Sequence, residues 1–301
     1  METSTERPDL YASVTARIVA ALEQGTPPWV RPWSRISDAL PVNAQTGRAY
    51  RGVNFALLSL EAQACSYLVN RWLTYRQANE LGAQVRRGER GSTVVFWQLR
   101  RVAATGETFP DDQPPDHRDK IYPLLRAYTV FNVAQVDGLP ADQVQARIPT
   151  WEPEARGEEL LLMSSARFRQ GGTQAYYQPA TDEIHLPPLA AFPTASGYYA
   201  TALHELVHWS GHPSRCRRDL TGRFGDSAYA AEELVAEMGA AYLCAHCRID
   251  GELRHASYLQ SWLKVLRSDK RAIFTAAAQA QRAADYVLAL AQPPDAAAAA
   301  A

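Results

Sequence analysis

Apolar residues recur at helical spacing in several segments of the chain. Residues 10–24 place Val14, Ile18 and Leu22 on one face, and Gly25 then ends the segment. A similar pattern leads into residues 202–212, where Gly211 provides a helix stop. Further helices are predicted through Leu57-Leu58, near 74–82, over 154–165, over 230–241 and within 256–290.

Other segments have the composition of strands. Residues 92–99 (STVVFWQL) and 124–136 (LLRAYTVFNVAQV) are rich in β-branched and aromatic side chains. Residues 173–186 fit a hairpin whose turn is Pro179-Ala180-Thr181-Asp182. Because helices and strands are both well represented, we predict an α+β fold.

The chain is long enough for two domains, since its 301 residues exceed the usual size of one. Gly and Pro punctuate residues 138–153, so we place a linker at 141–153 between domains 1–140 and 154–292. Residues 105–120 look like a Pro-rich loop, and residues 293–301 a disordered, alanine-rich tail.

The chemistry of the chain is centred on His204-Glu205-Leu206-Val207-His208, an H-E-x-x-H pattern. On a helix the two histidines lie one turn apart on one face, where they can hold one metal ion. Zinc is the usual choice for such donors, and Mn²⁺ is the alternative divalent metal. Glu205 is then placed to act as a general base on water. Five residues with three fixed letters also occur by chance.

A hydrolytic zinc site needs a third protein ligand and one open position. Glu233 and Glu237 lie one turn apart on an otherwise small and apolar helix face. Buried carboxylates need partners, and a metal and a ligating histidine would provide them. Glu232 is the alternative ligand if the register differs by one residue, and solvated helix acids are the third possibility.

This arrangement resembles the glutamate-type zincin metallopeptidases. The resemblance implies that Glu233 is the third ligand and that Glu237 holds the ligating His204. His212 follows His208 too closely for the zincins that use a third histidine. Cys244 and Cys247 form a lone C-x-x-C, which cannot complete a four-ligand site and suggests two small apolar side chains.

The N-terminal half is basic although the whole chain has a net charge of −1. Residues 27–101 contain eleven arginines against four acidic residues, interleaved with aromatic side chains. This mixture suits single-stranded nucleic acid, because arginine binds phosphates and aromatic rings stack on bases. An ordinary core beneath an arginine-rich surface is the alternative. The residues selected as DNA contacts are Trp29, Arg31, Trp33, Arg48, Tyr50, Arg51, Arg71, Trp72, Arg86 and Arg87.

Several functional classes are disfavoured. No apolar run is long enough to cross a bilayer, and the N-terminus is polar. We therefore expect a cytoplasmic location and no membrane partner. The sequence has no G-x-x-x-x-G-K-S/T loop for nucleotide hydrolysis and no G-x-S-x-G nucleophile.

Longer motifs extend over most of the chain. They include Pro28-Trp29-x-x-Pro32-Trp33, Asn43-x-x-Thr46-Gly47-Arg48-x-Tyr50-Arg51-Gly52-x-Asn54 and Tyr198-Tyr199-Ala200-Thr201. Together with the H-E-x-x-H segment they resemble the ArdC-type antirestriction proteins of conjugative plasmids. The resemblance implies an N-terminal single-stranded DNA-binding domain, a C-terminal zincin-like metallopeptidase domain and protection of incoming plasmid DNA from restriction.

Three hypotheses remain open at the level of sequence. In one, the DNA-bound chain cleaves a protein, such as a restriction component, with Glu205 activating water. In another, the metal is structural and the chain protects single-stranded DNA by covering it. In the third, the chain is a protease acting on DNA–protein crosslinks.

Overall fold

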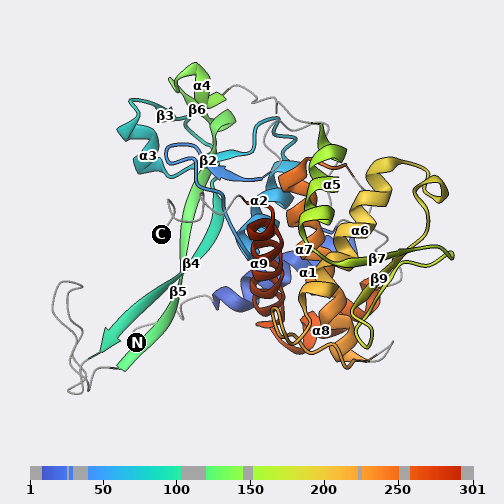
Figure 1. The fold of residues 1–301 in the computed structure, drawn as a ribbon. Helices are drawn as coiled ribbons and strands as arrows, with labels where there is room; N and C mark the ends of the chain where they lie inside the picture. Colours follow the sequence, from blue (N-terminus) through green and yellow to red (C-terminus); the bar gives the residue numbers. More distant parts are fainter. Residues whose placement is uncertain are drawn as a thin grey trace.

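A computed structural model gives the architecture of the chain. It describes residues 9–25, 27–29, 40–102, 120–144, 152–222, 226–250 and 258–292. Figure 1 shows strands and short helices of the N-terminal half beside a group of longer helices from the C-terminal half. The α+β class is therefore confirmed. Residues 103–119, the tail 293–301 and most of the predicted linker lie outside the described residues, as do Arg31 and Trp33.

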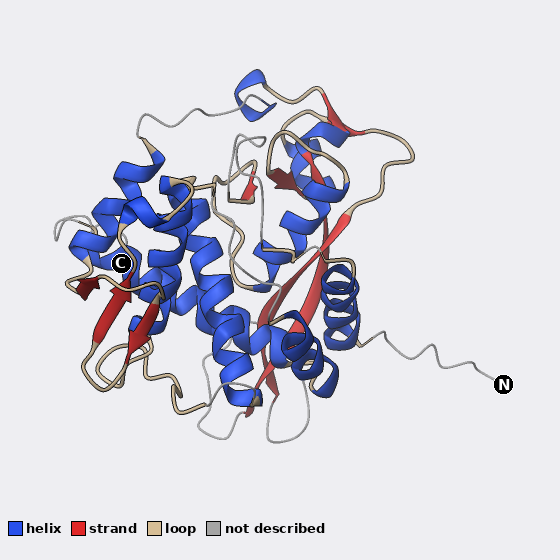
Figure 2. Cartoon of the chain, turned by 90° about the vertical axis from the view of Figure 1, so that its right-hand side faces the viewer, coloured by secondary structure: helices blue, strands red, loops and turns tan. Residues whose placement is uncertain are grey.

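A four-stranded sheet organises the N-terminal half, with the strand order β1-β2-β5-β4. Its two long strands form an antiparallel ribbon that runs past the helices (Figure 2). They cover 92–102 and 120–132, so the predicted segment 92–99 is longer than expected and the predicted segment 124–136 ends at Asn132. The strands are β1 (Val42–Asn43), β2 (Arg71–Leu73), β4 (Ser92–Val102) and β5 (Lys120–Asn132). A small second sheet pairs β3 (Gln84–Val85) with β6 (Val136–Asp137), and the 3₁₀ helix η2 (Val133–Gln135) joins β5 to β6.

The helix α2 (Val53–Ala64) protects the outer edge of β4. The Asn54 amide donates to the Val95 carbonyl at 2.7 Å and accepts from the Val95 N–H at 2.8 Å. Gly52, just before the helix, has φ of +58°, a conformation that favours glycine. The Arg-Gly-x-Asn motif is thus explained by backbone geometry and edge protection.

The C-terminal half is mostly helical. A three-stranded sheet of order β7-β9-β8 lies against its helices, and β8 and β9 form the predicted hairpin. The strands are β7 (Arg167–Gln170), β8 (Tyr176–Gln178) and β9 (Glu183–Leu186). The helices are α5 (Pro153–Met163), α6 (Ala195–Ser210), α7 (Ser227–Cys247), α8 (Leu259–Ser268) and α9 (Ala272–Leu290). The short elements are α3 (Tyr75–Glu80), α4 (Ala141–Val144) and η3 (Leu189–Ala191).

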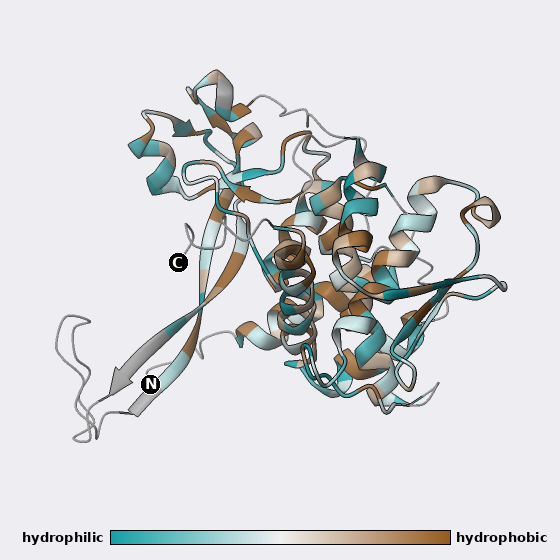
Figure 3. Cartoon of the chain, viewed as in Figure 1, coloured by the Kyte–Doolittle hydropathy of each residue, from teal (hydrophilic) through white to brown (hydrophobic). Residues whose placement is uncertain are grey.

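One hydrophobic core includes residues from both halves of the chain. Figure 3 shows hydrophobic residues on the inner helices of the helical half, and buried apolar side chains from both halves form one cluster there. The helix α1 (Leu10–Glu23) packs against α8, and the Thr15 hydroxyl donates to the Lys270 carbonyl at 2.7 Å. Trp29 contacts Trp262 edge to face, with ring centroids 5.8 Å apart. The helix α1 and Trp29 are therefore built into the helical half, and the boundary at 141–153 stays a prediction.

The close contact between α6 and α7 depends on Gly239. A β carbon at this position would lie 2.9 Å from both γ carbons of Val207. We expect Gly239→Val to lower the free energy of unfolding by about 1–3 kcal/mol, because the overpacked helices must move apart. Thermal and chemical denaturation measure this loss. In a Val207→Ala background the same substitution should cost less, and an equal cost in both backgrounds would contradict the steric explanation.

Candidate metal centre

The helix α6 presents both histidines of the motif to α7. Its first turn is capped by the Thr194 hydroxyl, which accepts from the Gly197 N–H at 3.0 Å, and Gly211 is its C-cap, as predicted. The rings of His204 and His208 lie with their centroids 4.9 Å apart. One face of α6 therefore carries two imidazoles one turn apart.

Glu233 of α7 reaches this face. Its carboxylate oxygens lie 3.7 Å from Nε2 of His204 and 3.4 Å from Nε2 of His208. Two ligands of a tetrahedral ion with bonds of about 2.1 Å are about 3.4 Å apart, so these separations fit one metal ion. The three ligand atoms lie within 4.8 Å of one another, and this is the one such cluster in the part of the chain that the structure describes.

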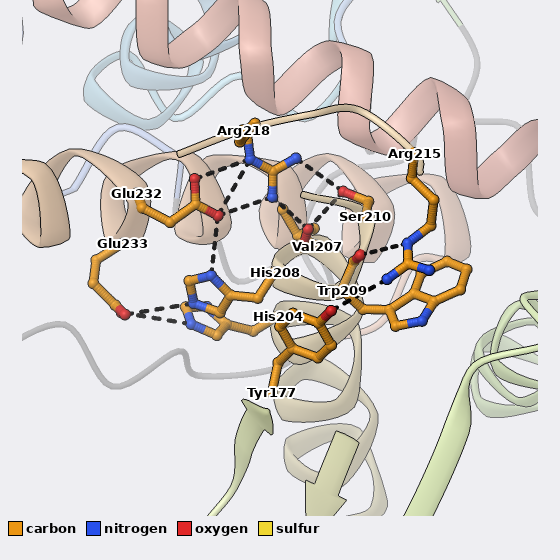
Figure 4. A network of polar contacts seen from close by, with 10 residues as sticks. All are labelled: Tyr177, His204, Val207, His208, Trp209, Ser210, Arg215, Arg218, Glu232 and Glu233. Atoms are coloured by element: carbon orange, nitrogen blue, oxygen red, sulfur yellow. Dashed lines mark hydrogen bonds and ion pairs between the residues drawn. The ribbon is translucent and has the colours of Figure 1, made fainter. Parts of the chain in front are cut away.

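Glu232, the alternative ligand, has another position. Its carboxylate lies 3.1 Å from Nδ1 of His208, on the opposite side of the ring from Glu233. It also accepts from Arg218 at 2.9 Å, as Figure 4 shows. A carboxylate on the outer nitrogen fixes the ring orientation and leaves Nε2 for a metal.

Arg218 connects this carboxylate to the end of α6. It donates to the Val207 carbonyl at 2.5 Å and to the Ser210 hydroxyl at 3.0 Å, and its side chain is only 4% exposed. In sequence Arg218 is one of several arginines in the loop after the motif, and nothing marks it for this role. For Glu232, the partner of Arg218, the sequence offered one signal, which is its position directly before Glu233.

Glu205 lies buried beside the histidines. Burial raises the pKa of the Glu205 carboxyl, and the Tyr177 backbone N–H of β8 and the nearby imidazoles act in the opposite direction. A raised carboxyl pKa brings the group closer to neutral pH, where a general base is most effective. The geometry therefore agrees with the role predicted for Glu205, which stays a prediction.

The neighbouring carboxylates raise the pKa of both imidazoles. Burial lowers the pKa of His208, but hydrogen bonds with Glu232 and Glu233 outweigh it and raise the pKa to about 10. Burial also lowers the pKa of His204, but the hydrogen bond with Glu233 and the negative charge of the buried Glu237 outweigh it and raise the pKa. Without a metal the carboxylates therefore favour imidazolium, and Glu237 acts on His204 at least through its charge.

The remaining residues weighed as metal ligands lie elsewhere. Nδ1 of His212 is 2.8 Å from the Ser214 hydroxyl, outside the cluster. Cys244 and Cys247 are buried free thiols on α7, and burial raises the pKa of Cys247 to about 12. Among the described residues, no cysteine belongs to a metal-binding group.

The predicted DNA contacts divide into buried and exposed residues. Trp29 and Trp72 are fully buried, and Tyr50 and Arg71 are buried as well. Their burial contradicts a direct role in stacking or phosphate contact, because the core covers their side chains. The exposed members are Arg48, Arg51, Arg86 and Arg87, of which Arg51 pairs with Asp285 and Arg86 with Glu89 and Asp137. Among helices in the described residues, none is long and apolar enough to cross a membrane.

Comparison with known proteins covers both halves. Residues 8–131 match the N-terminal domain of anti-restriction factor ArdC, and residues 155–279 match a zincin-like metallopeptidase. The uncharacterized protein y4eC of Sinorhizobium fredii is 44% identical over 93% of this chain and 91% of its own length. A DNA primase TraC of Escherichia coli is 40% identical over 94% of this chain, which spans 27% of that primase.

Two solved structures share the fold. The metal-free crystal structure of the antirestriction ArdC protein from plasmid R388 has a TM-score of 0.79 and 43% identity, covering 94% of this chain and 98% of that one. Its Mn(II)-bound structure has a TM-score of 0.77 and 43% identity, covering 95% and 99% of the two chains. The likeness thus extends over nearly the full length of both chains, and the chain belongs to the ArdC family of antirestriction proteins.

Proposed function

We propose that this chain is an antirestriction protein that binds single-stranded DNA and carries a divalent-metal peptidase site. The observation that carries the peptidase part is the convergence of His204, His208 and Glu233 ligand atoms within 4.8 Å, with Glu205 buried beside them. The Mn(II)-bound relative supports a divalent ion at these residues. The donor set suits zinc as well as manganese.

Within this site each residue has a separate task. A bound divalent ion would polarise water and a peptide carbonyl as a Lewis acid. Glu205 would take the proton of the attacking water and pass it to the leaving amine. Glu232 and Arg218 would keep the His208 ring oriented, and Glu237 would support His204 through its negative charge.

A protein substrate, such as a restriction component, would bind along β8. This strand is at the edge of its sheet, and the Tyr177 backbone N–H within it points at Glu205. An extended peptide that pairs with an edge strand gains backbone hydrogen bonds while one of its carbonyls approaches the metal site. Cleavage of a crosslinked protein on DNA would use the same edge strand.

Single-stranded DNA is the second proposed partner. The match to the ArdC N-terminal domain and the relationship to TraC primases support contact with DNA by residues of 1–140. Exposed arginines such as Arg48 and Arg87 provide phosphate-binding charge. The zincin-like half would then occupy 154–292, after a linker at 141–153.

The deciding experiment compares two variants in a restriction-protection assay with purified protein. Glu205→Gln should keep the metal and DNA binding but lose any proteolysis, because the amide cannot accept a proton. If Glu205→Gln protects DNA as well as the unaltered chain, protection comes from DNA occupancy and the metal is structural. His204→Ala, compared in parallel, shows whether the metal matters at all.

Metal binding should release protons. At pH 7 the raised pKa of His208, about 10, keeps its ring protonated in the metal-free chain, and a metal must displace that proton. Metal affinity is therefore expected to fall as pH is lowered, by about tenfold per pH unit for each proton released. Titration calorimetry in buffers of different ionisation enthalpy counts the protons. A metal affinity that does not change between pH 6 and 8 would contradict this prediction.

A further inference from the structure

The β4–β5 ribbon carries a row of exposed aromatic side chains. Beyond the part covered by α2, its far half extends away from the helices (Figure 1). Phe96 is 46% exposed, Tyr128 43% and Tyr122 51%, which is unusual for large apolar rings on one ladder. Exposure of large aromatic rings to water is unfavourable, so three of them on one face indicate a binding partner.

The pairing register places these rings on one face. In an antiparallel ladder, opposite residues share a face and alternate residues along a strand return to it. Phe96 is opposite Arg126, and Tyr128 is opposite Val94, so Phe96, Arg126, Tyr128 and Tyr122 belong to the same face. The Phe96 and Tyr128 rings meet edge to face with centroids 5.7 Å apart, and the buried Tyr50 ring lies 6.4 Å from Phe96 in the adjoining core.

The opposite face of the ribbon has a different role. There Trp97 lies against Tyr11 of α1, with ring centroids 5.9 Å apart, and Val95 enters the main core. This face helps to attach the ribbon to the helices. On the row's own face Val94 and Val130 are buried in a core with Leu58 of α2. Phe96, Tyr128 and Tyr122 stay exposed although both faces contribute to anchoring the ribbon.

The charge of the ribbon points to an anionic partner. The two strands contain Arg100, Arg101, Lys120 and Arg126 and no Asp or Glu. Arg126 is exposed and forms no ion pair with any residue that the structure describes. Arg126 among the exposed rings offers a phosphate contact beside stacking surfaces, the combination by which proteins hold single-stranded nucleic acid.

We infer that single-stranded DNA binds along this face of the ribbon, with bases stacked on Phe96, Tyr128 and Tyr122 and a phosphate held by Arg126. The inference rests on the proposed function and names the surface that performs it. Tyr122 and Tyr128 are six residues apart, so the row spans about 20 Å of strand. That length fits the smallest sites of single-strand-binding domains, about four nucleotides. These rings take the place of the buried Trp29 and Trp72 as stacking platforms.

The test measures binding of a fluorescent oligothymidylate to the full chain by anisotropy. Phe96→Ala and Tyr128→Ala should each weaken binding by about tenfold, because each removes one stacking platform. Phe96→Trp should retain binding, whereas Phe96→Leu should weaken it, since leucine is apolar but cannot stack. Tyr75→Ala is the matched control, because Tyr75 is 49% exposed on α3, outside the aromatic row, and should change nothing.

A second measurement addresses Arg126. Arg126→Gln should reduce the salt dependence of binding by about 0.7 in the slope of log K against log salt, which corresponds to one phosphate contact. Unaltered melting temperatures show that each variant is folded. If the unaltered chain binds and all ribbon variants bind equally well, the ribbon assignment is overturned while the proposed function stands.

Two further outcomes are informative. If the unaltered chain does not bind single-stranded DNA, the proposed DNA function is overturned together with its surface. If the ribbon variants change sedimentation but leave DNA binding intact, the row is a contact between copies of the chain and the DNA assignment is overturned. Photocrosslinking of an iodouracil-containing oligonucleotide to Phe96 or Tyr128 would support the assignment directly.

Discussion

Glu233→Ala is expected to abolish divalent-metal binding. Glu233 is the one carboxylate within 4 Å of Nε2 of both His204 and His208 among the described residues, so its loss leaves two imidazoles without the third ligand. We expect metal affinity to fall by more than about 100-fold, since loss of outer partners alone changes affinity by about 10–100-fold. Metal content after dialysis and titration calorimetry measure the effect.

Two comparisons sharpen this prediction. Glu232→Gln keeps the three ligands but weakens the hydrogen bond to Nδ1 of His208. It should therefore reduce metal affinity by about 10–100-fold. Glu80→Gln, an exposed carboxylate on α3, should leave metal affinity unchanged. Full metal occupancy of Glu233→Ala at the affinity of the unaltered chain would show that Glu233 is no ligand.

The second large effect is expected from Arg218→Met. Removal of this guanidinium leaves the buried Glu232 carboxylate with His208 as its main partner and frees the Val207 carbonyl at the end of α6. Breaking a buried ion pair from one side costs about 3–5 kcal/mol, because the remaining charge stays buried. Urea denaturation measures the loss, and Arg218→Met combined with Glu232→Gln should recover part of it.

The pH dependence of that loss follows from the Glu232 carboxyl. Burial raises its pKa, but the hydrogen bonds with His208 and Arg218 outweigh burial and leave the pKa below the ordinary 4.5. A depressed carboxyl pKa stabilises the fold above the unfolded value and loses that effect as pH falls through the folded value. The difference between Arg218→Met and the unaltered chain should therefore shrink below pH 4.5. A difference that stays constant well below pH 4.5 would contradict the pairing.

Local pattern was sufficient for much of the fold. The helices at 10–23, 195–210 and 227–247 and the hairpin of β8 and β9 were predictable because helical and strand periodicity and end signals involve only nearby residues. The same is true of the pair His204 and His208, whose approach is fixed by one helical turn. Glu233 followed from a family resemblance together with its place on an apolar helix face.

Long-range packing decided which role each of several residues of the same type has. Glu232 and Glu233 are neighbours in sequence, yet one contacts the outer nitrogen of His208 and the other faces Nε2 of both rings. That difference depends on how α7 rotates against α6, which Gly239 permits by its close approach to Val207. Periodicity within α7 cannot specify that rotation.

By itself the sequence determined most of the long elements, the paired imidazoles and the family, because these depend on contacts a few residues apart and on long motifs. The tertiary structure alone decided which aromatic and basic residues reach solvent. Trp29 is buried against Trp262 from the C-terminal half of the chain, whereas Phe96 and Tyr128 remain exposed on the ribbon. Burial of a side chain depends on packing against residues distant in sequence, and composition does not specify which residues those are.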